Sequence, residues 1–577
     1  MRKFLSVVCS SFLIASPGWT MRHIQPDAYP KAFQDQMHRP SKAQIHAAGT
    51  ARAAIISSAS GPKTIAVILV QFPSADGSWT SGSRTIQSYA NIASYFSNIS
   101  AYFSEASYNN LTLSFKFFGA TAPNQDVASD AGAYTLAHSM EYYGCGDEGT
   151  GCSGVTTPTS PAIGANGNYL IRDALNAAGG AVNSTSFAAV IVMHAGNGNE
   201  TTLADGDIWS IYYSDDAIIQ SAGTGFNEGD VVPETEASGI SSPMGVICHE
   251  FGHALGLPDL YNTGSAGGTS VVGDWDLMDS GPFDGSGANP AHPGAWDKLA
   301  LGWATVQTVT TRDSYTLNPV ETNSRVIKLP VQNGLPQEYF LIEYRLRTSG
   351  AAYDQSIPGD GLIIWHVDDA ITASRGVTAT DQSVANTVNS GSPHYGVSIV
   401  TANGIAISGS NQGSSGNTFG GERRNFISPQ SNNFNGDASG ISVVNISGVG
   451  TDTTRFDVAN LAVTADQSIS KVISYPNPAG KGYAHPSGEG HATLQFHLTR
   501  PANDYQINIY TLSGDLVRKI SKEEIALNID RSDNLKWVYE FVWDLKNGDG
   551  ALVAPGVYLY LVRADNKSKG AKAVIIR

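Results

Sequence analysis

The 577-residue chain has little charge, few cysteines and no long apolar run after its N-terminus. Charged residues make up 15% of it, against about 25% in an average protein. The net charge of −16 argues against nucleic-acid binding, because that function needs a basic surface. No segment beyond the N-terminus is apolar enough to cross a membrane. The 61 glycines and the many serines, threonines and asparagines instead suggest a loop-rich, strand-rich extracellular protein.

The N-terminus has the layout of a secretory signal. Arg2 and Lys3 precede an apolar run from Phe4 to Ala15, which is too short to span a bilayer. We therefore expect a signal peptide over residues 1–19 and a secreted or cell-surface protein. Residues 20–60 are polar and lack strong periodicity, so we interpret them as a leader or propeptide.

The four cysteines have different expected fates. Cys9 lies inside the signal segment. Cys145 and Cys152 flank a short glycine-rich loop, and in an exported protein this spacing predicts a disulfide, with a metal-binding pair as the alternative. Cys248 lies on a predicted helix, where we expect it to be packed in the core.

The most informative stretch begins at His249 and reads His-Glu-Phe-Gly-His-Ala-Leu-Gly-Leu-Pro-Asp. Two histidines four apart on a helix, here His249 and His253, share one face and can bind one zinc ion. The intervening Glu250 can reach a water on that metal and act as a general base. Gly256 can adopt a positive φ and end the helix. The turn that follows can bring Asp259 back as the third ligand.

The surrounding residues predict the limits of this helix. Ser242 is a good N-cap, and Pro243 fits the first helical position. Ile247, Phe251 and Leu255 recur every four residues and predict an apolar stripe that faces the core. The alternative is an ordinary amphipathic helix that carries the histidine pattern by chance.

The third ligand has alternatives. Asp259 could instead be a loop acid that caps the next turn, and Asp274, Asp276 or Asp279 could take its place. A carboxylate oxygen is a permitted zinc ligand, and three protein ligands leave a fourth position for water. Met278 follows Asp259 by 19 residues, a spacing typical of a structural methionine turn below a zinc site.

These motifs resemble the immune-inhibitor-A-like secreted bacterial metallopeptidases, which are zinc enzymes of the metzincin type. The resemblance rests on the block that begins at His249, on Gly-Asp-Trp-Asp-Leu-Met-Asp-Ser-Gly around Met278, and on Trp-Asp-Lys at 296–298. It covers roughly residues 60–460. Its other parts begin with a first strand at Ile65–Phe72, an early helix at Tyr102–Tyr108 and a strand and loop before the site at His194–Glu200. A later region consists of two segments, Glu338–Arg345 and Gly359–Asp368.

The expected fold is an α+β zinc peptidase domain of metzincin type, with an α/β upper half, over residues 61–305. Alternating strands and helices before the zinc helix support this fold. These elements are expected at 64–72, 86–106, 168–179 and 187–194. Short β-branched runs between glycine, asparagine and serine clusters then predict an all-β accessory domain over residues 306–460.

Residues 461–577 predict a linker and a C-terminal Ig-like β-sandwich. They contain alternating strands such as Gln506–Tyr510 and a hairpin turn at Asn547–Gly550. The segment resembles the small sandwich of flagellar hook-capping proteins and of C-terminal sorting domains of exported bacterial proteins. It therefore either stabilises the protein or serves export or surface attachment through secretion machinery.

Two other places carry less specific metal patterns. Glu200, Asp205 and Asp207 share one Gly/Asn-rich loop, whose carboxylates could bind Ca²⁺. His366 and Asp368 could also bind a metal, but a structural hydrogen-bonded pair within the β domain is the favoured interpretation.

The predicted function is that of a secreted, monomeric zinc endopeptidase that hydrolyses protein or peptide substrates, with Glu250 as the general base. One alternative is an inert surface binding or adhesion protein on the same scaffold, and the intact Glu250 argues against it. Another alternative is a zinc amidase that acts on cell-wall peptides. A proteolysis assay with and without a chelator separates an enzyme from a binding protein.

Overall fold

The computed structural model describes the chain from residue 59 to residue 576. The predicted signal peptide, nearly all of the leader and the Cys145–Cys152 pair lie outside the described residues. Within the described part, no helix is both long and apolar enough to cross a membrane. The segments that are not described inside this range are 74–83, 145–165, 203–205, 215, 265–268, 332–334, 336, 377–385, 392–393, 421–424, 461–468, 499–501, 503, 531–535 and 566.

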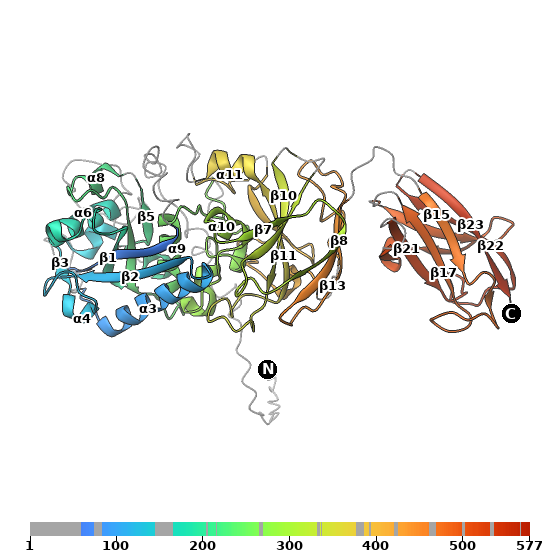
Figure 1. Cartoon of the computed structure of the whole chain (residues 1–577), viewed down its shortest axis with the longest axis horizontal. Coiled ribbons are helices and arrows are strands. Elements are labelled where there is room, and N and C mark those ends of the chain that lie inside the picture. The colour runs from blue at the N-terminus through green and yellow to red at the C-terminus, as the bar shows by residue number, and fades with distance from the viewer. Residues whose placement is uncertain are drawn as a thin grey trace, which may run out of the picture.

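A mainly parallel sheet forms the framework of the N-terminal region (Figure 1). Its strands follow the order β2-β1-β4-β6-β5, and β3 pairs with the end of β1. The first four strands run parallel, whereas the edge strand β5 is antiparallel to β6. The strands are β1 (Gly61–Gln71), β2 (Leu111–Phe118), β3 (Tyr134–Thr135), β4 (Ala189–Asn197), β5 (Ile211–Tyr213) and β6 (Gly229–Thr235).

Helices cover both faces of this sheet, because its central strands are apolar on both sides. Ile65, Val67 and Leu69 of β1 face the core that α3 and α9 close. The residues between them face the core on the opposite side, where α6 packs. The helices are α3 (Tyr89–Ala106), α4 (Ala128–Ala131), α5 (Met140–Gly144), α6 (Asn166–Ala178), α7 (Asn199–Thr202), α8 (Ala217–Gln220), α9 (Met244–Ala254) and α10 (Ala295–Ala300).

Two further sheets form the middle region. One has the order β12-β11-β10-β9-β7 and the other has the order β13-β14-β8. Neighbouring strands are antiparallel except for β7, which runs parallel to β9. The elements are β7 (Thr305–Thr308), β8 (Asp313–Leu317), β9 (Arg325–Pro330), β10 (Glu338–Arg345), β11 (Gly361–Asp368), α11 (Asp369–Arg375), β12 (Val397–Val400), β13 (Ile441–Ser447) and β14 (Thr454–Asn460).

Strands β10 and β11 are buried on both faces because each face closes a different core. Leu341 and Trp365 share a core with Met278 of the N-terminal region. Ile342 and Ile364 point the other way and pack in the core between the two middle sheets. The middle region is therefore joined to the N-terminal region by a continuous apolar core.

A buried arginine adds a polar connection between the same two regions. The Arg345 side chain is fully buried. Its Nε donates to Glu343 Oε1 at 2.9 Å, and its Nη1 donates to Asp354 Oδ2 at 2.6 Å. Its Nη2 donates to the carbonyl oxygen of Trp275 at 3.3 Å. Because an uncompensated buried charge is costly, this network holds the turn after Trp275 in a fixed position.

The C-terminal region consists of two sheets that enclose one apolar core. Their orders are β15-β17-β21-β20 and β16-β23-β22-β18-β19. Figure 1 shows them in orange and red, at the end of the molecule away from the N-terminal sheet. The strands are β15 (Ile469–Tyr475), β16 (Ala479–Gly480), β17 (Ala492–Leu498), β18 (Tyr505–Tyr510), β19 (Leu516–Ile520), β20 (Ala526–Asp530), β21 (Lys536–Trp543), β22 (Gly556–Ala564) and β23 (Lys567–Ile576).

Candidate metal centre

Helix α9 carries the histidine motif and begins one residue later than predicted. Pro243 occupies the N-cap position, with φ −77° and ψ −3°. The prediction of Ser242 as the N-cap is therefore wrong, although its Oγ accepts a hydrogen bond from Met244 N at 3.2 Å. Proline already adopts the helical φ there, so the serine caps a turn that precedes the helix.

The predicted apolar stripe and the predicted end of the helix are both present. Ile247, Phe251 and Leu255 are buried in the core that β1 shares. Gly256 has a φ of 104°, a value that favours glycine over residues with a side chain. Its N–H donates to the carbonyl oxygen of His253 at 2.8 Å. The chain leaves the helix at this point and returns towards it.

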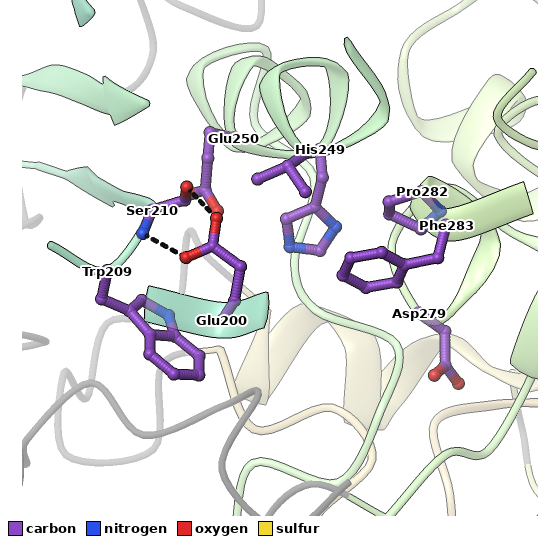
Figure 2. Close-up of a pocket in the computed structure, with 9 residues that line it drawn as sticks. Glu200, Trp209, Ser210, His249, Glu250, Asp279, Pro282 and Phe283 are labelled. Atoms are coloured by element: carbon purple, nitrogen blue, oxygen red, sulfur yellow. Dashed lines mark hydrogen bonds between the residues drawn. The ribbon is translucent and has the colours of Figure 1, made fainter. Parts of the chain in front are cut away.

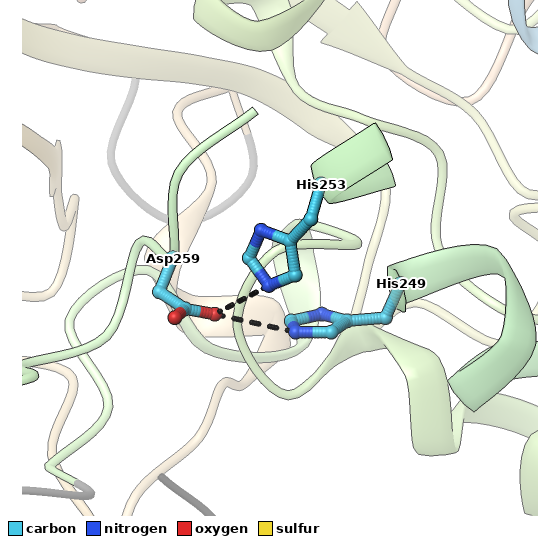
Figure 3. A group of neighbouring side chains, drawn as sticks. All are labelled: His249, His253 and Asp259. Carbon is cyan, nitrogen blue, oxygen red and sulfur yellow. Dashed lines mark ion pairs between the residues drawn. The ribbon is translucent and has the colours of Figure 1, made fainter. Parts of the chain in front are cut away.

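This return brings three side chains together (Figure 3). Asp259 Oδ1 lies 3.2 Å from His249 Nε2 and 3.2 Å from His253 Nε2. The two imidazole rings are nearly perpendicular, at 86°, with centroids 4.8 Å apart. Although Oδ1 is buried, it has no hydrogen-bond partner, so neither contact has the geometry of an N–H···O bond.

The backbone fixes the proton positions on both imidazoles. His249 Nδ1 lies 2.9 Å from the carbonyl oxygen of Leu277, and His253 Nδ1 lies 2.8 Å from that of Leu257. A carbonyl oxygen only accepts, so each Nδ1 carries the hydrogen. In the neutral imidazoles each Nε2 then presents a lone pair towards Asp259. A histidine held in this way by a backbone carbonyl is typical of a metal ligand.

The donor atoms fit a tetrahedral ion. Two ligand atoms that bind zinc at about 2.0–2.1 Å lie roughly 3.3 Å apart in a tetrahedral site, and both nitrogen–oxygen distances here are 3.2 Å. Burial raises the pKa of Asp259, but in the metal-free site the protonated forms of His253 and His249 lower it more, to well below its usual value. The carboxylate is therefore ionised, as a metal ligand must be.

Met278 lies against the part of α9 that carries the two histidines. It is fully buried, and a Cβ added to Gly252 would meet Met278 Sδ at 2.8 Å. Its carbonyl oxygen accepts a hydrogen bond from Leu260 N at 2.8 Å. The methionine turn thus supports both the helix and the loop that carries Asp259.

The alternative third ligands have other partners. Asp276 accepts from Met278 N at 2.7 Å and from Gly294 N at 2.7 Å. Asp279 accepts from the hydroxyl of Ser270 and from the backbone N–H groups of residues 271–273, at 2.8–2.9 Å. Asp274 is not part of the histidine cluster. Of the four candidates, Asp259 alone joins the two histidines in the described part of the chain.

A small pocket opens beside His249. Figure 2 shows Glu250, Glu200 and Ser210 on one side of it and Phe283 on the other. Burial raises the pKa of Glu250 to about 8, although His249 acts in the opposite direction. The side chain predicted to act as a base thus lines the same small pocket as one of the two histidines.

Sequence reasoning did not identify two neighbours of Asp259. Burial raises the pKa of the Tyr261 hydroxyl well above its usual value, and the neighbouring Asp259 carboxylate adds to this effect. Asn386 contacts Asp259, and it lies 127 residues further along the chain. Tyr261 could have been identified by its spacing from Asp259, but no local pattern marks Asn386.

The calcium prediction has no support in the structure. Glu200 accepts from Ser210 N at 3.1 Å and from Ser210 Oγ, and Asp207 Oδ1 lies 3.4 Å from Arg84 Nη2. Asp205 is outside the described residues. Within the described chain, the only three His, Cys, Asp or Glu side chains that could share an ion are the histidine cluster of α9 and Asp259.

His366 and Asp368 make structural hydrogen bonds, as the favoured interpretation has it, but with other residues and not with each other. His366 Nε2 lies 2.7 Å from Glu338 Oε1, and Asp368 Oδ2 lies 2.9 Å from His394 Nε2. Side chains two apart on a strand share a face but are about 6.6 Å apart along it. Each therefore bonds to a neighbour from another segment instead.

Cys248 is free and buried in the core, as expected.

The segment that contains the cluster is similar to a known peptidase domain. Residues 180–304 match the profile of the immune inhibitor A peptidase M6 catalytic domain. The pre-pro-metalloprotease PrtV of Vibrio cholerae serotype O1, in two strains, is 34% identical over 92 residues. That match covers 16% of this chain and 10% of PrtV, so the chain spans about a tenth of the length of these relatives.

Two solved structures from Porphyromonas gingivalis also align with the chain, each at 15% identity. PorZ, a bacterial surface component of the type-IX secretion system, has a TM-score of 0.17 over 44% of this chain and 22% of its own. Dimeric latent PorU has a TM-score of 0.15 over 41% and 24%. Scores this low do not define a common fold. The part of the chain that holds the histidine cluster thus matches the catalytic domain of the immune inhibitor A metallopeptidases, as its sequence motifs predicted.

Proposed function

We propose that the chain is an exported zinc-dependent endopeptidase in which His249, His253 and Asp259 hold the metal. The observation that carries the proposal is the convergence of two imidazole lone pairs on one carboxylate oxygen, at 3.2 Å from each. Its position inside a segment that matches a metallopeptidase catalytic domain supports the same conclusion. Three protein ligands leave a fourth position open, as catalytic zinc sites require.

The side chains of this site have separate roles in the proposed reaction. Zinc, when bound, polarises the scissile carbonyl and lowers the pKa of water. Glu250 accepts the proton of the attacking water on a carboxylate oxygen and passes it to the nitrogen of the leaving amine. The carbonyl oxygens of Leu277 and Leu257 keep both imidazoles oriented.

Casein hydrolysis by the purified chain tests this function. We expect hydrolysis that a chelator abolishes and that added zinc restores. Glu250→Gln should reduce turnover by roughly 10²–10⁴-fold, the usual contribution of general acid–base catalysis, while the zinc content remains that of the wild type. Zinc binding without hydrolysis of casein or of a peptide library would instead support a binding protein on a peptidase scaffold.

Export is the second part of the proposal. It is supported by the basic and apolar layout of residues 1–19. Protein recovered from the culture medium of an expressing bacterium should lack this segment when its N-terminus is sequenced. An intact Met1 on protein retained in the cytoplasm would contradict export without affecting the assignment of the metal site.

A further inference from the structure

A side chain from the middle region binds Asp259 through two hydrogen bonds. Asn386 Nδ2 donates to Asp259 Oδ2 at 2.6 Å. Asn386 Oδ1 accepts from the backbone N–H of Asp259 at 2.7 Å. One amide group therefore fixes both the backbone and the carboxylate of the same residue, which no other side chain of the described site does.

The segment that carries Asn386 is itself anchored to the loop after α9. Thr263 Oγ1 donates to the carbonyl oxygen of Asn386 at 2.6 Å. Asn389 Nδ2 donates to the carbonyl oxygen of Leu260 at 2.7 Å. Val388 is fully buried in the core that contains α9. Asn386 has a φ of 55°, a conformation that asparagine and glycine adopt more readily than other residues.

These bonds decide which oxygen of Asp259 faces the histidines. Because Oδ2 is engaged by the Asn386 amide, Oδ1 is left to point at the two Nε2 atoms. A carboxylate held in this way can offer one oxygen to a metal, so that the ion keeps an open fourth position.

We infer that Asn386 is a positioning residue for the metal, and that the middle region thereby completes the metal centre of the N-terminal region. The inference rests on the proposed zinc site. Hydrogen-bond partners of metal ligands commonly contribute roughly 10–100-fold to metal affinity. Asn386 would act by holding Asp259 in its binding orientation before the metal arrives. Its removal should therefore weaken zinc binding, and turnover should fall only as a consequence of the lost zinc.

The test is zinc affinity of the full chain, measured by competition with a chromophoric chelator. Asn386→Gly removes the amide and keeps the positive φ, so its backbone can remain unchanged. We expect its dissociation constant for zinc to rise by roughly 10–100-fold. Peptidase activity should return to within a few-fold of the wild type at saturating zinc, because Asn386 contacts no reacting group.

Asn389→Ala is the matched control. Asn389 belongs to the same segment and bonds Leu260 and Val397, but it does not contact Asp259. We expect it to lower the unfolding temperature of the metal-free protein and to change zinc affinity much less than Asn386→Gly does. Equal losses of affinity in both variants would overturn the inference, since docking of the segment alone would then explain them.

Other outcomes are equally clear. Wild-type zinc affinity in Asn386→Gly, with a metal-free unfolding temperature close to that of the wild type, would also overturn the inference while leaving the proposed function intact. A wild-type chain that binds no zinc in the same assay would instead remove the proposed function on which the inference rests.

Discussion

His249 and His253 form one pair of histidines beside a carboxylate, and His366 and His394 form another. In the first pair, both Nε2 atoms lie 3.2 Å from the same oxygen of Asp259. In the second pair, each Nε2 atom has a carboxylate of its own, at 2.7 and 2.9 Å. Both pairs have the residue types of a metal site, but the donor atoms of the first pair converge and those of the second do not.

An aromatic ring separates the second pair. The Phe434 ring stacks on His366 with centroids 3.7 Å apart and on His394 with centroids 3.8 Å apart. The planes differ by only 3° and 17°, so the three rings form one stack with Phe434 in the centre. Glu338 Oε1 also accepts from Phe434 N at 2.8 Å. This histidine stack is a packing and hydrogen-bonding unit of the middle region.

The convergence of donor atoms, and not the residue types, distinguishes the candidate metal site from the histidine stack. Residue composition is similar in the two places, but lone pairs must meet at one point to bind an ion. At His249 and His253, the helix spacing and the Gly256 turn produce that convergence. At His366 and His394, the imidazoles are parallel and each is hydrogen-bonded to its own carboxylate, so a metal ion would have to break both of these contacts.

Zinc content should differ most between variants of the two histidine pairs. His249→Ala should abolish stoichiometric zinc binding and with it casein hydrolysis, since one of three ligands is lost. His366→Ala should retain zinc and activity. Atomic absorption on dialysed protein measures both variants. Loss of zinc from His366→Ala, with the fold intact by circular dichroism, would remove the distinction between the pairs.

A second variant tests the histidine stack by its stability. Phe434→Leu removes two ring contacts, each worth about 0.5–1.5 kcal/mol beyond the area buried. We therefore expect the free energy of unfolding of the middle region to fall by roughly 1–3 kcal/mol, from urea titration. Zinc content should remain unchanged. An unfolding midpoint equal to that of the wild type would show that the stack contributes no stability.

The smallest expected effect is a pH dependence of the same region. Burial lowers the pKa of His366, although Glu338 opposes this effect. The unfolded chain then takes up this proton at a higher pH than the folded one, so stability is lost as pH falls below about 6.5. Burial raises the pKa of Glu338, but hydrogen bonds from His366 and from the backbone lower it by more, so the net pKa lies below the usual value of 4.5. The stability that Glu338 contributes is therefore lost only as the pH falls below about 4.5.

Urea midpoints at pH 7.5 and 5.5 measure this prediction, because, of the His366–Glu338 pair, only the histidine contributes within that window. The wild-type midpoint should fall on acidification, and His366→Gln should show a smaller fall. Comparing the two proteins at both pH values cancels the contributions of groups that they share. A fall of the same size in both would contradict the assigned role of His366.

The local part of the metal centre could be predicted from sequence because it follows helix geometry. His249, Glu250 and His253 lie within two turns of one helix, and Gly256 marks its end by a positive φ. Asp259 follows three residues later, so few turn conformations connect it to the site. The N-cap was misassigned because Ser242 and Pro243 both favour helix starts, and only coordinates show which residue the first turn includes.

The distant part could not be predicted because it depends on docking between regions. Asn386 reaches Asp259 only after the middle region packs on the core that contains α9. Likewise, His366 and Asp368 are neighbours in sequence, yet their partners come from β10 and from the loop with His394. Sequence spacing on a strand fixes the face of a side chain but not the neighbour that it meets.

The most direct test of the metal centre is a crystal structure of the zinc-soaked chain with anomalous data at the zinc edge. We expect one strong peak about 2.0–2.2 Å from His249 Nε2, His253 Nε2 and Asp259 Oδ1. A peak between His366 and His394, or the absence of any peak beside Asp259, would show that these three side chains do not form the zinc site.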